Sequence, residues 1–120
     1  MAMILIADDS PTALAQLRQE LAPLGHEIVE AVDGEDAQVR LDAKRPDLVI
    51  LDIIMPKLNG FQLCRRIRAN PNLEGLPIIV VTAMDRESDR YWGLKQGADD
   101  FLVKPIDGDE LREKVRSYLS

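Results

Sequence analysis

Five short runs of mainly apolar residues recur along the chain, and polar or glycine-containing segments separate them. They are MILIA (3–7), EIVEAV (27–32), DLVILD (47–52), PIIVVTA (77–83) and DFLVK (100–104). Runs of this length that are rich in Val, Ile and Leu and bounded by polar residues are typical of buried β-strands. The pattern therefore predicts five strands.

The segments that follow the runs carry small and apolar residues three or four positions apart, which is the spacing of one helix face. The clearest stripes are Leu14, Leu17, Leu21 and Leu24; Ala37 and Leu41; Gly60, Cys64 and Ile67; and Leu111, Val115 and Tyr118. Ser10 before Pro11 predicts the start of the first helix, and Gly97 predicts the end of the fourth. Strands that alternate with helices favour βαβ units, so we expect an α/β domain whose parallel sheet is flanked by five helices.

The composition of each run predicts its place in the sheet. LVIL (48–51) and IIVV (78–81) are apolar on both faces, as central parallel strands are. EIVEAV contains charges and DFLVK is short, which suits edge strands. With right-handed crossovers and the second strand at one edge, the simplest strand order is 2-1-3-4-5. We therefore predict one doubly wound, flavodoxin-like domain that spans residues 1–120.

Charge and composition argue against several classes of protein. The net charge of −6 argues against direct binding of nucleic acid, because phosphate contacts need a basic surface. Cys64 is the only cysteine, so no internal disulfide can form, and its helical spacing predicts a buried, unreactive thiol. The N-terminal sequence lacks the basic start of a signal peptide, and no apolar run reaches the roughly 18 residues of a membrane span. We expect a cytoplasmic protein.

Reactive polar side chains follow four of the five predicted strands. Asp8 and Asp9 come after the first strand and Asp52 after the third, while Thr82 ends the fourth and Lys104 the fifth. Because the carboxyl ends of parallel strands meet at one edge of the sheet, we expect these side chains to lie together. Each has a simpler role when taken alone, as a helix-capping acid, a strand-end hydroxyl or a turn residue. Their coincidence at one edge favours a shared site.

The chemistry of these groups indicates phosphoryl transfer. Three clustered carboxylates repel one another and need a cation, and oxygen ligands suit Mg²⁺, which often shares its coordination shell with a phosphate. Lys104 can neutralise phosphoryl oxygens, and Thr82 can donate a hydrogen bond. A carboxylate such as Asp52 can itself accept the phosphoryl group.

Four motifs, in this order and at these spacings, resemble the receiver domain of two-component response regulators, the CheY-like family. They are the acid pair Asp8-Asp9, LDIIMPKLNG with Asp52, VTA with Thr82 and Ala83, and GADDFLVKP with Lys104 and Pro105. Each motif is weak by itself, but the four together are specific. The resemblance extends over the whole chain.

The resemblance implies a phosphoryl acceptor and a metal site. Asp52 would take a phosphoryl group from the phosphohistidine of a sensor histidine kinase or from a small donor such as acetyl phosphate. Mg²⁺ would be bound by Asp9, Asp52 and the backbone carbonyl of Ile54. Asp8 would act on the metal through water.

The resemblance also implies roles for the groups around the acceptor. Lys104 would neutralise phosphoryl charge, and its peptide bond to Pro105 would be cis, which proline makes accessible. Thr82 would move toward the phosphoryl group on activation. The backbone amides of Ile54 and Ala83 would be further hydrogen-bond donors.

The same resemblance implies how the signal leaves the domain. Receiver domains commonly bind their targets through the fourth helix, fifth strand and fifth helix, where Arg90, Leu94, Phe101 and Lys114 would form one surface. The family's switch aromatic is often Tyr, whereas Phe101 can turn inward but cannot donate a hydroxyl hydrogen bond. The segment RYWGLKQGA resembles stand-alone regulators of type IV pilus twitching and phototaxis, although ordinary packing is the simpler explanation of Trp92 itself.

The lifetime of the phosphorylated state depends on whether water can reach the acyl phosphate. In receiver domains, the side chains two positions beyond the acceptor and two beyond the threonine overhang this approach, and here they are Ile54 and Met84. Neither orients a water molecule, and both are bulky and apolar. We therefore expect slow self-dephosphorylation.

Three alternatives remain at this point. A phosphatase of the haloacid dehalogenase type uses similar groups, but it needs a second acid where this chain has Ile54. A receiver that serves only as a docking module would not need the intact set of site residues. Because the chain ends at Ser120, just after the fifth helix, we expect it to signal by contact with a downstream protein, unless the sequence is part of a longer regulator. We also expect a monomer or weak dimer.

Overall fold

All five predicted strands are present in the computed structural model, which describes residues 1–119 and leaves Ser120 outside the described residues. The elements are β1 (Met3–Ala7), α1 (Pro11–Leu21), η1 (Ala22–Leu24), β2 (Glu27–Ala31), α2 (Gly34–Ala43), β3 (Leu48–Leu51), α3 (Gly60–Ala69), η2 (Pro71–Leu73), β4 (Ile78–Thr82), α4 (Glu87–Lys95), β5 (Asp100–Val103) and α5 (Gly108–Leu119). Neighbouring strands are parallel and their order is β2-β1-β3-β4-β5. The predicted strand order and edge strands are confirmed.

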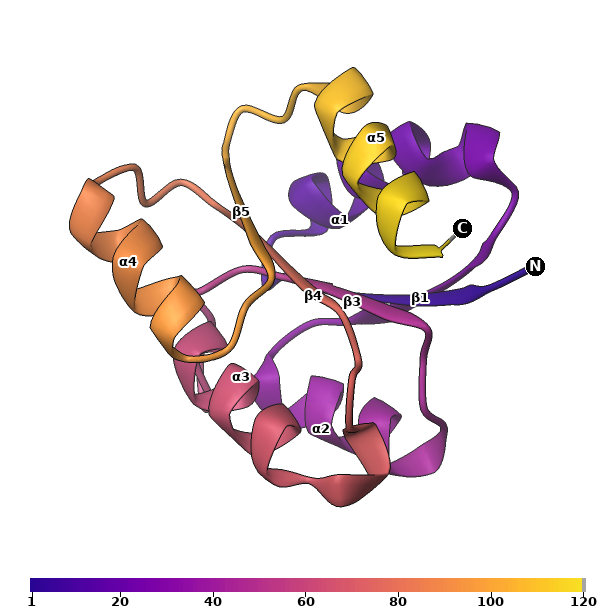
Figure 1. The fold of residues 1–120 in the computed structure, drawn as a ribbon. Helices are drawn as coiled ribbons and strands as arrows, with labels where there is room; N and C mark the ends of the chain where they lie inside the picture. Colours follow the sequence, from indigo (N-terminus) through magenta and orange to yellow (C-terminus); the bar gives the residue numbers. More distant parts are fainter. Residues whose placement is uncertain (120) are drawn as a thin grey trace.

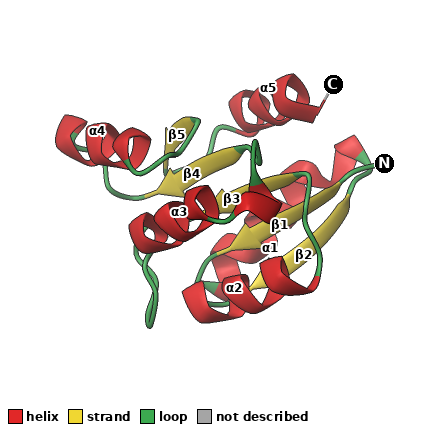
Figure 2. Cartoon of the chain, turned by 60° about the horizontal axis from the view of Figure 1, so that its bottom comes forward, coloured by secondary structure: helices red, strands yellow, loops and turns green. Residues whose placement is uncertain are grey.

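Helices cover both faces of the sheet. In Figure 1, α1 and α5 lie on one side of the strands and α2 and α3 on the other, while α4 lies beside β5. Figure 2 shows the strands side by side between these helices. The doubly wound α/β architecture predicted from the apolar runs is therefore confirmed. No helix within residues 1–119 is both long and apolar enough to span a membrane.

Two apolar cores, one on each face of the sheet, hold the layers together. Ile4 and Ile6 of β1 belong to the core beneath α1 and α5, whereas Leu5 and Ala7 belong to the core beneath α2 and α3. All four side chains are buried. Successive side chains of a strand point to opposite faces, so a strand that is covered on both sides is apolar throughout. This is why uninterrupted apolar runs identify the central strands.

The two helix boundaries predicted from the sequence are confirmed. The Ser10 hydroxyl accepts a hydrogen bond from the amide of Ala13 at 3.2 Å, and Pro11 is the first residue of α1. At the other boundary, α4 ends at Lys95 and Gly97 follows with φ of 115°. A positive φ is accessible to glycine at little cost, so the chain can turn there into β5.

The start of α3 lies directly against the loop that carries Asp52. Asn59 and Gln62 form a capping box, in which each side chain accepts a hydrogen bond from the other's backbone amide. A Cβ atom on Gly60 would lie 2.3 Å from the carbonyl oxygen of Asp52, so this close approach needs glycine. The first turn of α3 therefore supports the backbone of the residue that follows β3.

Cys64 gives a test of the packing beneath α3. Its side chain is fully buried, and desolvation raises the pKa of the thiol to about 12. Because the thiolate is the reactive form, we predict that Ellman's reagent at about pH 8 does not react with the native protein but does react after unfolding in guanidinium. A Ser88→Cys variant is the control, since position 88 is exposed on α4 and should react in the native state. Equally fast reaction of native Cys64 would contradict the prediction.

Candidate functional site

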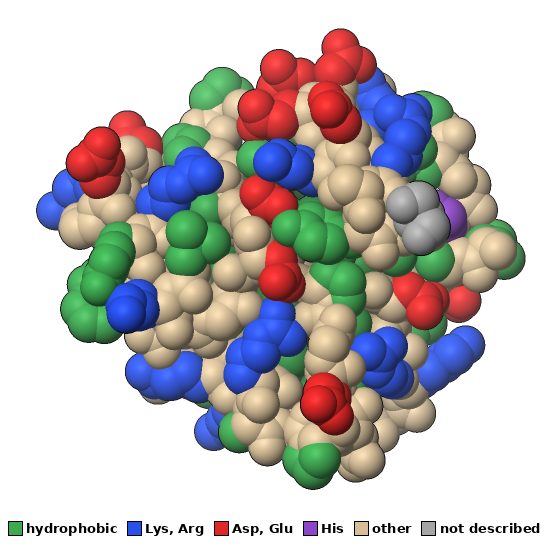
Figure 3. Space-filling model, viewed as in Figure 1, with side chains coloured by type: hydrophobic (Ala, Val, Ile, Leu, Met, Phe, Trp, Pro, Cys, Tyr) green, Lys and Arg blue, Asp and Glu red, His purple; other side chains and the backbone are tan. Residues whose placement is uncertain are grey.

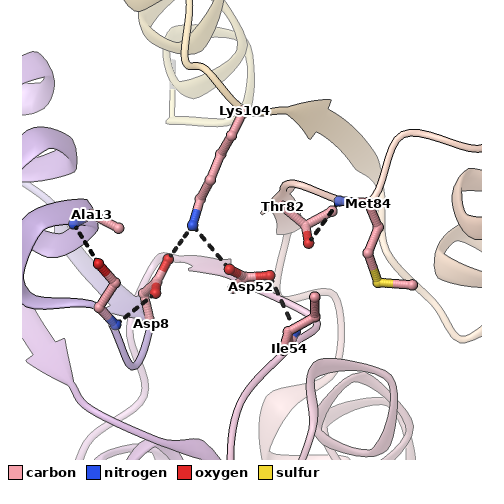
Figure 4. Close-up of polar contacts among 8 residues, drawn as sticks. Asp8, Ala13, Asp52, Ile54, Thr82, Met84 and Lys104 are labelled. Atoms are coloured by element: carbon pink, nitrogen blue, oxygen red, sulfur yellow. Dashed lines mark hydrogen bonds and ion pairs between the residues drawn. The ribbon is translucent and has the colours of Figure 1, made fainter.

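The side chain of Lys104 lies between two buried carboxylates at the carboxyl edge of the sheet (Figure 4). Its Nζ donates hydrogen bonds to Oδ2 of Asp8 at 2.7 Å and to Oδ2 of Asp52 at 2.9 Å. Asp8 is 1% exposed and Asp52 is 7% exposed. A carboxylate removed from water is costly unless a cation compensates it, and Lys104 compensates both. The structure thus brings together three of the predicted site residues.

The sheet itself sets the positions of these three residues. The amide of Asp8 donates to the last carbonyl of β2 at 3.1 Å, and the amide of Asp52 donates to the last carbonyl of β1 at 3.0 Å. The amide of Lys104 donates to the last carbonyl of β4 at 2.8 Å. Each residue thus extends the hydrogen-bond ladder just beyond its strand, which fixes where its side chain begins. The peptide bond between Lys104 and Pro105 is cis, as the resemblance implied.

The other two carboxylate oxygens accept hydrogen bonds from backbone amides. Oδ1 of Asp8 accepts from Ser10 at 2.9 Å, and Oδ1 of Asp52 accepts from Ile54 at 3.1 Å. Desolvation raises the pKa of Asp8, although its hydrogen bonds with Lys104 and Ser10 oppose the shift. Desolvation acts to lower the pKa of Lys104, but hydrogen bonds to both carboxylates outweigh it and the pKa is raised. Lys104 is therefore held in its charged form.

Asp9 lies apart from the pair that Lys104 joins. Its side chain is exposed, whereas that of Asp8 next to it is buried. Within residues 1–119, no three acidic, histidine or cysteine side chains are grouped closely enough to hold a metal ion. The residue types nevertheless suit Mg²⁺, which prefers oxygen donors, because Asp8, Asp9 and Asp52 all follow the neighbouring strands β1 and β3.

Thr82 and its neighbours lie on the other side of Asp52. Thr82 is fully buried, and its Oγ1 accepts a hydrogen bond from the amide of Met84 at 3.4 Å. Ala83, between them, is exposed. Figure 4 shows Ile54 next to Asp52, whereas Met84 lies farther away, beyond Thr82. The Ile54 side chain is 58% exposed, although its backbone amide donates to Asp52.

The predicted output surface needs one correction. Arg90 and Leu94 of α4 are exposed and Lys114 of α5 is partly exposed, but Phe101 is only 2% exposed. The ring of Phe101 packs against Gly93, where a Cβ atom would lie 2.9 Å from Cδ2 of the ring. The missing side chain at Gly93 therefore leaves room for Phe101 inside. Sequence reasoning missed Gly93, although an isolated glycine in the middle of a helix often has such a packing role.

Comparisons with known proteins agree with this geometry. Residues 4–116 match the response regulator receiver domain family. Protein PilH of Pseudomonas aeruginosa is 41% identical over 120 residues, which cover 100% of this chain and 99% of PilH. The phosphate regulon transcriptional regulatory protein PhoB of Rhizobium meliloti is 41% identical over 116 residues, which cover 97% of this chain and 51% of PhoB. The chain thus spans nearly all of one relative and about half of the other.

A solved structure is similar over the same length. It is the receiver domain of sensor histidine kinase PA1611 from Pseudomonas aeruginosa PAO1, with a magnesium ion coordinated in its active site cleft. The TM-score is 0.90 at 30% identity, and the match covers 98% of this chain and 97% of that one. The similarity therefore includes every strand that contributes a residue to the site.

The pairing around Lys104 predicts a large effect on stability. Lys104→Ala should lower the free energy of unfolding by about 3 kcal/mol, because it leaves two neighbouring buried carboxylates without a cation. Urea unfolding near neutral pH, in the presence of a chelator, measures this change. Lys114→Ala is the matched control, since its ion pair with Asp100 (3.2 Å) is more exposed and should contribute less than about 1 kcal/mol. Equal losses in both variants would show that Lys104 does not compensate the pair.

The contact between Gly93 and Phe101 predicts that Gly93→Ala changes the free energy of unfolding in opposite directions with and without the ring of Phe101. Alanine is favoured over glycine in a helix by about 1 kcal/mol, whereas overpacking a core costs about 1–3 kcal/mol. Gly93→Ala should therefore destabilise the wild type but stabilise a Phe101→Ala background. Urea unfolding of the two single variants and the double variant measures both effects. If Gly93→Ala stabilised both backgrounds alike, the buried ring would not depend on the glycine.

Proposed function

Because the chain belongs to the response regulator receiver domain family, we propose that it is a phosphorylation-dependent signalling switch that accepts a phosphoryl group on Asp52. One observation carries this proposal: the buried Asp52 carboxylate is held at the carboxyl edge of the sheet by Lys104 and the Ile54 amide. These contacts fix a carboxylate at the site where phosphoryl transfer was expected from the sequence. They also support the proposed role of Lys104, whose ammonium group lies 2.9 Å from an oxygen of the proposed acceptor.

The proposed step is a displacement at phosphorus. An oxygen of Asp52 attacks the phosphorus atom of a phosphohistidine on a sensor histidine kinase, the phosphorus–nitrogen bond breaks, and the imidazole leaves with the electron pair. Lys104 neutralises the oxygens of the transferred group. The amides of Ile54 and Ala83 are proposed as further donors to those oxygens. In this role the chain catalyses only its own phosphorylation and dephosphorylation.

We propose that Mg²⁺ assists this transfer. Asp9, Asp52 and the carbonyl of Ile54 would be its protein ligands, and Asp8 would act through water. When bound, the metal ion supplies positive charge that reduces the repulsion between carboxylates and phosphoryl oxygens. The exposed position of Asp9 supports this role, because its oxygens are accessible to a hydrated ion. The magnesium ion in the PA1611 receiver domain supports it by similarity.

Thr82 is proposed to link the phosphoryl group to the output surface. Its hydroxyl, which now accepts from a backbone amide, would donate to a phosphoryl oxygen instead. Such a switch shifts populations only as far as the phosphoryl group binds the two states differently. Phe101, buried in this structure, would turn with Thr82. Arg90 and Leu94, together with Lys114, would form the surface that a downstream protein reads.

We propose a role in pilus motility or taxis. The segment RYWGLKQGA suggested this role, and the similarity to Protein PilH over nearly its full length supports it. We further propose that the chain works in the cytoplasm, as response regulators such as its relatives generally do, and that it is a monomer or weak dimer. The phosphatase alternative has no support, because the family match is to receiver domains and Ile54 cannot protonate a leaving group.

Phosphorylation by acetyl phosphate tests the proposed acceptor. With Mg²⁺ present, intact-mass measurement should show one added phosphoryl group, and a chelator should prevent its addition. Asp52→Asn should abolish labelling, Asp9→Asn should raise the Mg²⁺ concentration required, and the control Asp42→Asn, an exposed acid on α2, should change neither. A phosphoryl group found on Ser10 or Thr82 of the Asp52→Asn variant would overturn the assignment.

Ile54, next to Asp52, and Met84, beyond Thr82, are both apolar, and we therefore predict slow loss of the phosphoryl group. Positioning a reactant can be worth several kcal/mol, and a change of about 1.4 kcal/mol is tenfold in rate. Ile54→Asn combined with Met84→Glu should speed hydrolysis about tenfold or more without abolishing phosphorylation, because both new side chains can orient water. The decay of phosphoprotein after removal of the donor measures the rate. Equal decay in wild type and double variant would mean that these positions do not control access of water.

A further inference from the structure

The α4 helix has a second exposed side, which faces α3 instead of the proposed output surface. Successive residues of a helix are about 100° apart, so Trp92 lies on the same side of α4 as Gln96, which caps the helix, while Arg90 and Leu94 lie on the other side. Gln96 reaches α3, where its Oε1 accepts a hydrogen bond from Arg65 at 3.4 Å. Trp92 is therefore placed over the junction of α3 and α4.

A shallow cleft runs along this junction. It has a volume of about 360 Å³ and is lined by Asn59, Phe61, Gln62, Arg65, Trp92 and Gln96. A second cleft of about 360 Å³ continues along α3 and shares Gln62 and Arg65 with the first. We call Phe61, Gln62, Arg65, Arg66, Trp92 and Gln96 the α3/α4 surface. It is large enough to receive an extended or helical segment of another chain.

The α3/α4 surface is basic in a protein whose net charge is −6. The α3 sequence, GFQLCRRIRA, contains three arginines and no acidic residue. Arg65, Arg66 and nearby Lys95 are all exposed, and none of them forms an ion pair with a carboxylate within residues 1–119. Figure 3 shows Lys and Arg side chains beside a hydrophobic patch over α4 and the adjoining part of α3. These charges complement an acidic partner.

The aromatic residues beside these charges are unusually accessible. Trp92 is 54% exposed and Tyr91 is 55% exposed, and their rings meet edge to face at 5.8 Å. Lys95 lies over the ring of Tyr91 at 5.6 Å. Trp, Tyr and Arg are the residues that most often dominate the binding energy of protein interfaces. Packing within the domain therefore accounts for only part of the Trp92 surface.

We propose that the α3/α4 surface binds an acidic segment of a partner protein, which places an apolar side chain against Trp92. A second copy of this chain suits the surface less well. Its acidic cluster, Asp107, Asp109 and Glu110, lies at the start of α5 and not on the α3/α4 surface. Binding of this cluster to the α3/α4 surface of another copy would be a head-to-tail contact, which would build open chains of molecules. The binding site proposed here is distinct from the output surface of Arg90, Leu94 and Lys114.

Peptide selection on the whole protein tests this proposal. Random peptides displayed on phage are selected for binding, and the enriched peptides are synthesised. We expect them to be acidic and to contain Leu, Phe or Trp. For peptides without tryptophan, the emission of Trp92, the only tryptophan in the chain, should shift to shorter wavelength on binding. Binding should weaken as salt is raised.

Charge reversal locates the contact. Arg65→Glu combined with Arg66→Glu should weaken peptide binding about tenfold or more, because like charges then face each other. Arg116→Glu is the matched control, since Arg116 is an exposed arginine on α5 and its change should alter affinity less than about twofold. Both variants should still be phosphorylated by acetyl phosphate, which shows that they are folded and that the proposed function is intact.

Four results would overturn the proposal. The first is a selection that enriches no acidic peptides, and the second is peptide binding that survives the charge reversal of Arg65 and Arg66. The third is self-association in sedimentation that the same reversal abolishes, which would identify a second copy as the occupant. The fourth is reversal-sensitive binding to vesicles rich in phosphatidylglycerol, which would identify an anionic membrane.

Discussion

Asp8 and Asp52 can be buried side by side only because the ammonium group of Lys104 reaches between them. The strand order places Lys104 far from the two carboxylates along the edge of the sheet. Asp8 and Asp52 follow the neighbouring strands β1 and β3, but Lys104 follows β5, and β4 lies between β3 and β5. A long side chain is therefore required, and β4 ends in the compact Thr82. Because the Lys104 side chain reaches past the end of β4, the hydroxyl group of Thr82 lies beside it.

This arrangement also explains why a local charge change can alter distant contacts. In the proposed switch, a group that added negative charge at Asp52 would compete with Asp8 for Lys104, and it would offer new acceptors to Thr82. Thr82 and Phe101 lie on the adjacent strands β4 and β5, where Thr82 pairs with Val103 and Phe101 pairs with Val80. Since protein interiors are close-packed, such a change favours one of two discrete arrangements over a continuous drift.

Much of the fold and part of the site could be predicted from the sequence, because a parallel sheet fixes which end of each strand meets the others. This reasoning placed Asp8, Asp52 and Lys104 together. It could not decide between Asp8 and Asp9, since adjacent residues point in opposite directions and only one of them can face the lysine. The burial of Phe101 could not be predicted either, because it depends on space that Gly93 leaves on a different element.

The α4 helix is held to the domain by few large side chains. Its buried residues are Asp89 and Gly93, and the Asp89 carboxylate is used locally, accepting from the amide of Arg86 at 3.2 Å. A helix that buries so little apolar surface can shift at low cost. The packing of α4 depends instead on the ring of Phe101, which fills the space at Gly93. Because one side of α4 carries the proposed output surface and the other carries Trp92, any shift that follows Phe101 changes both surfaces together.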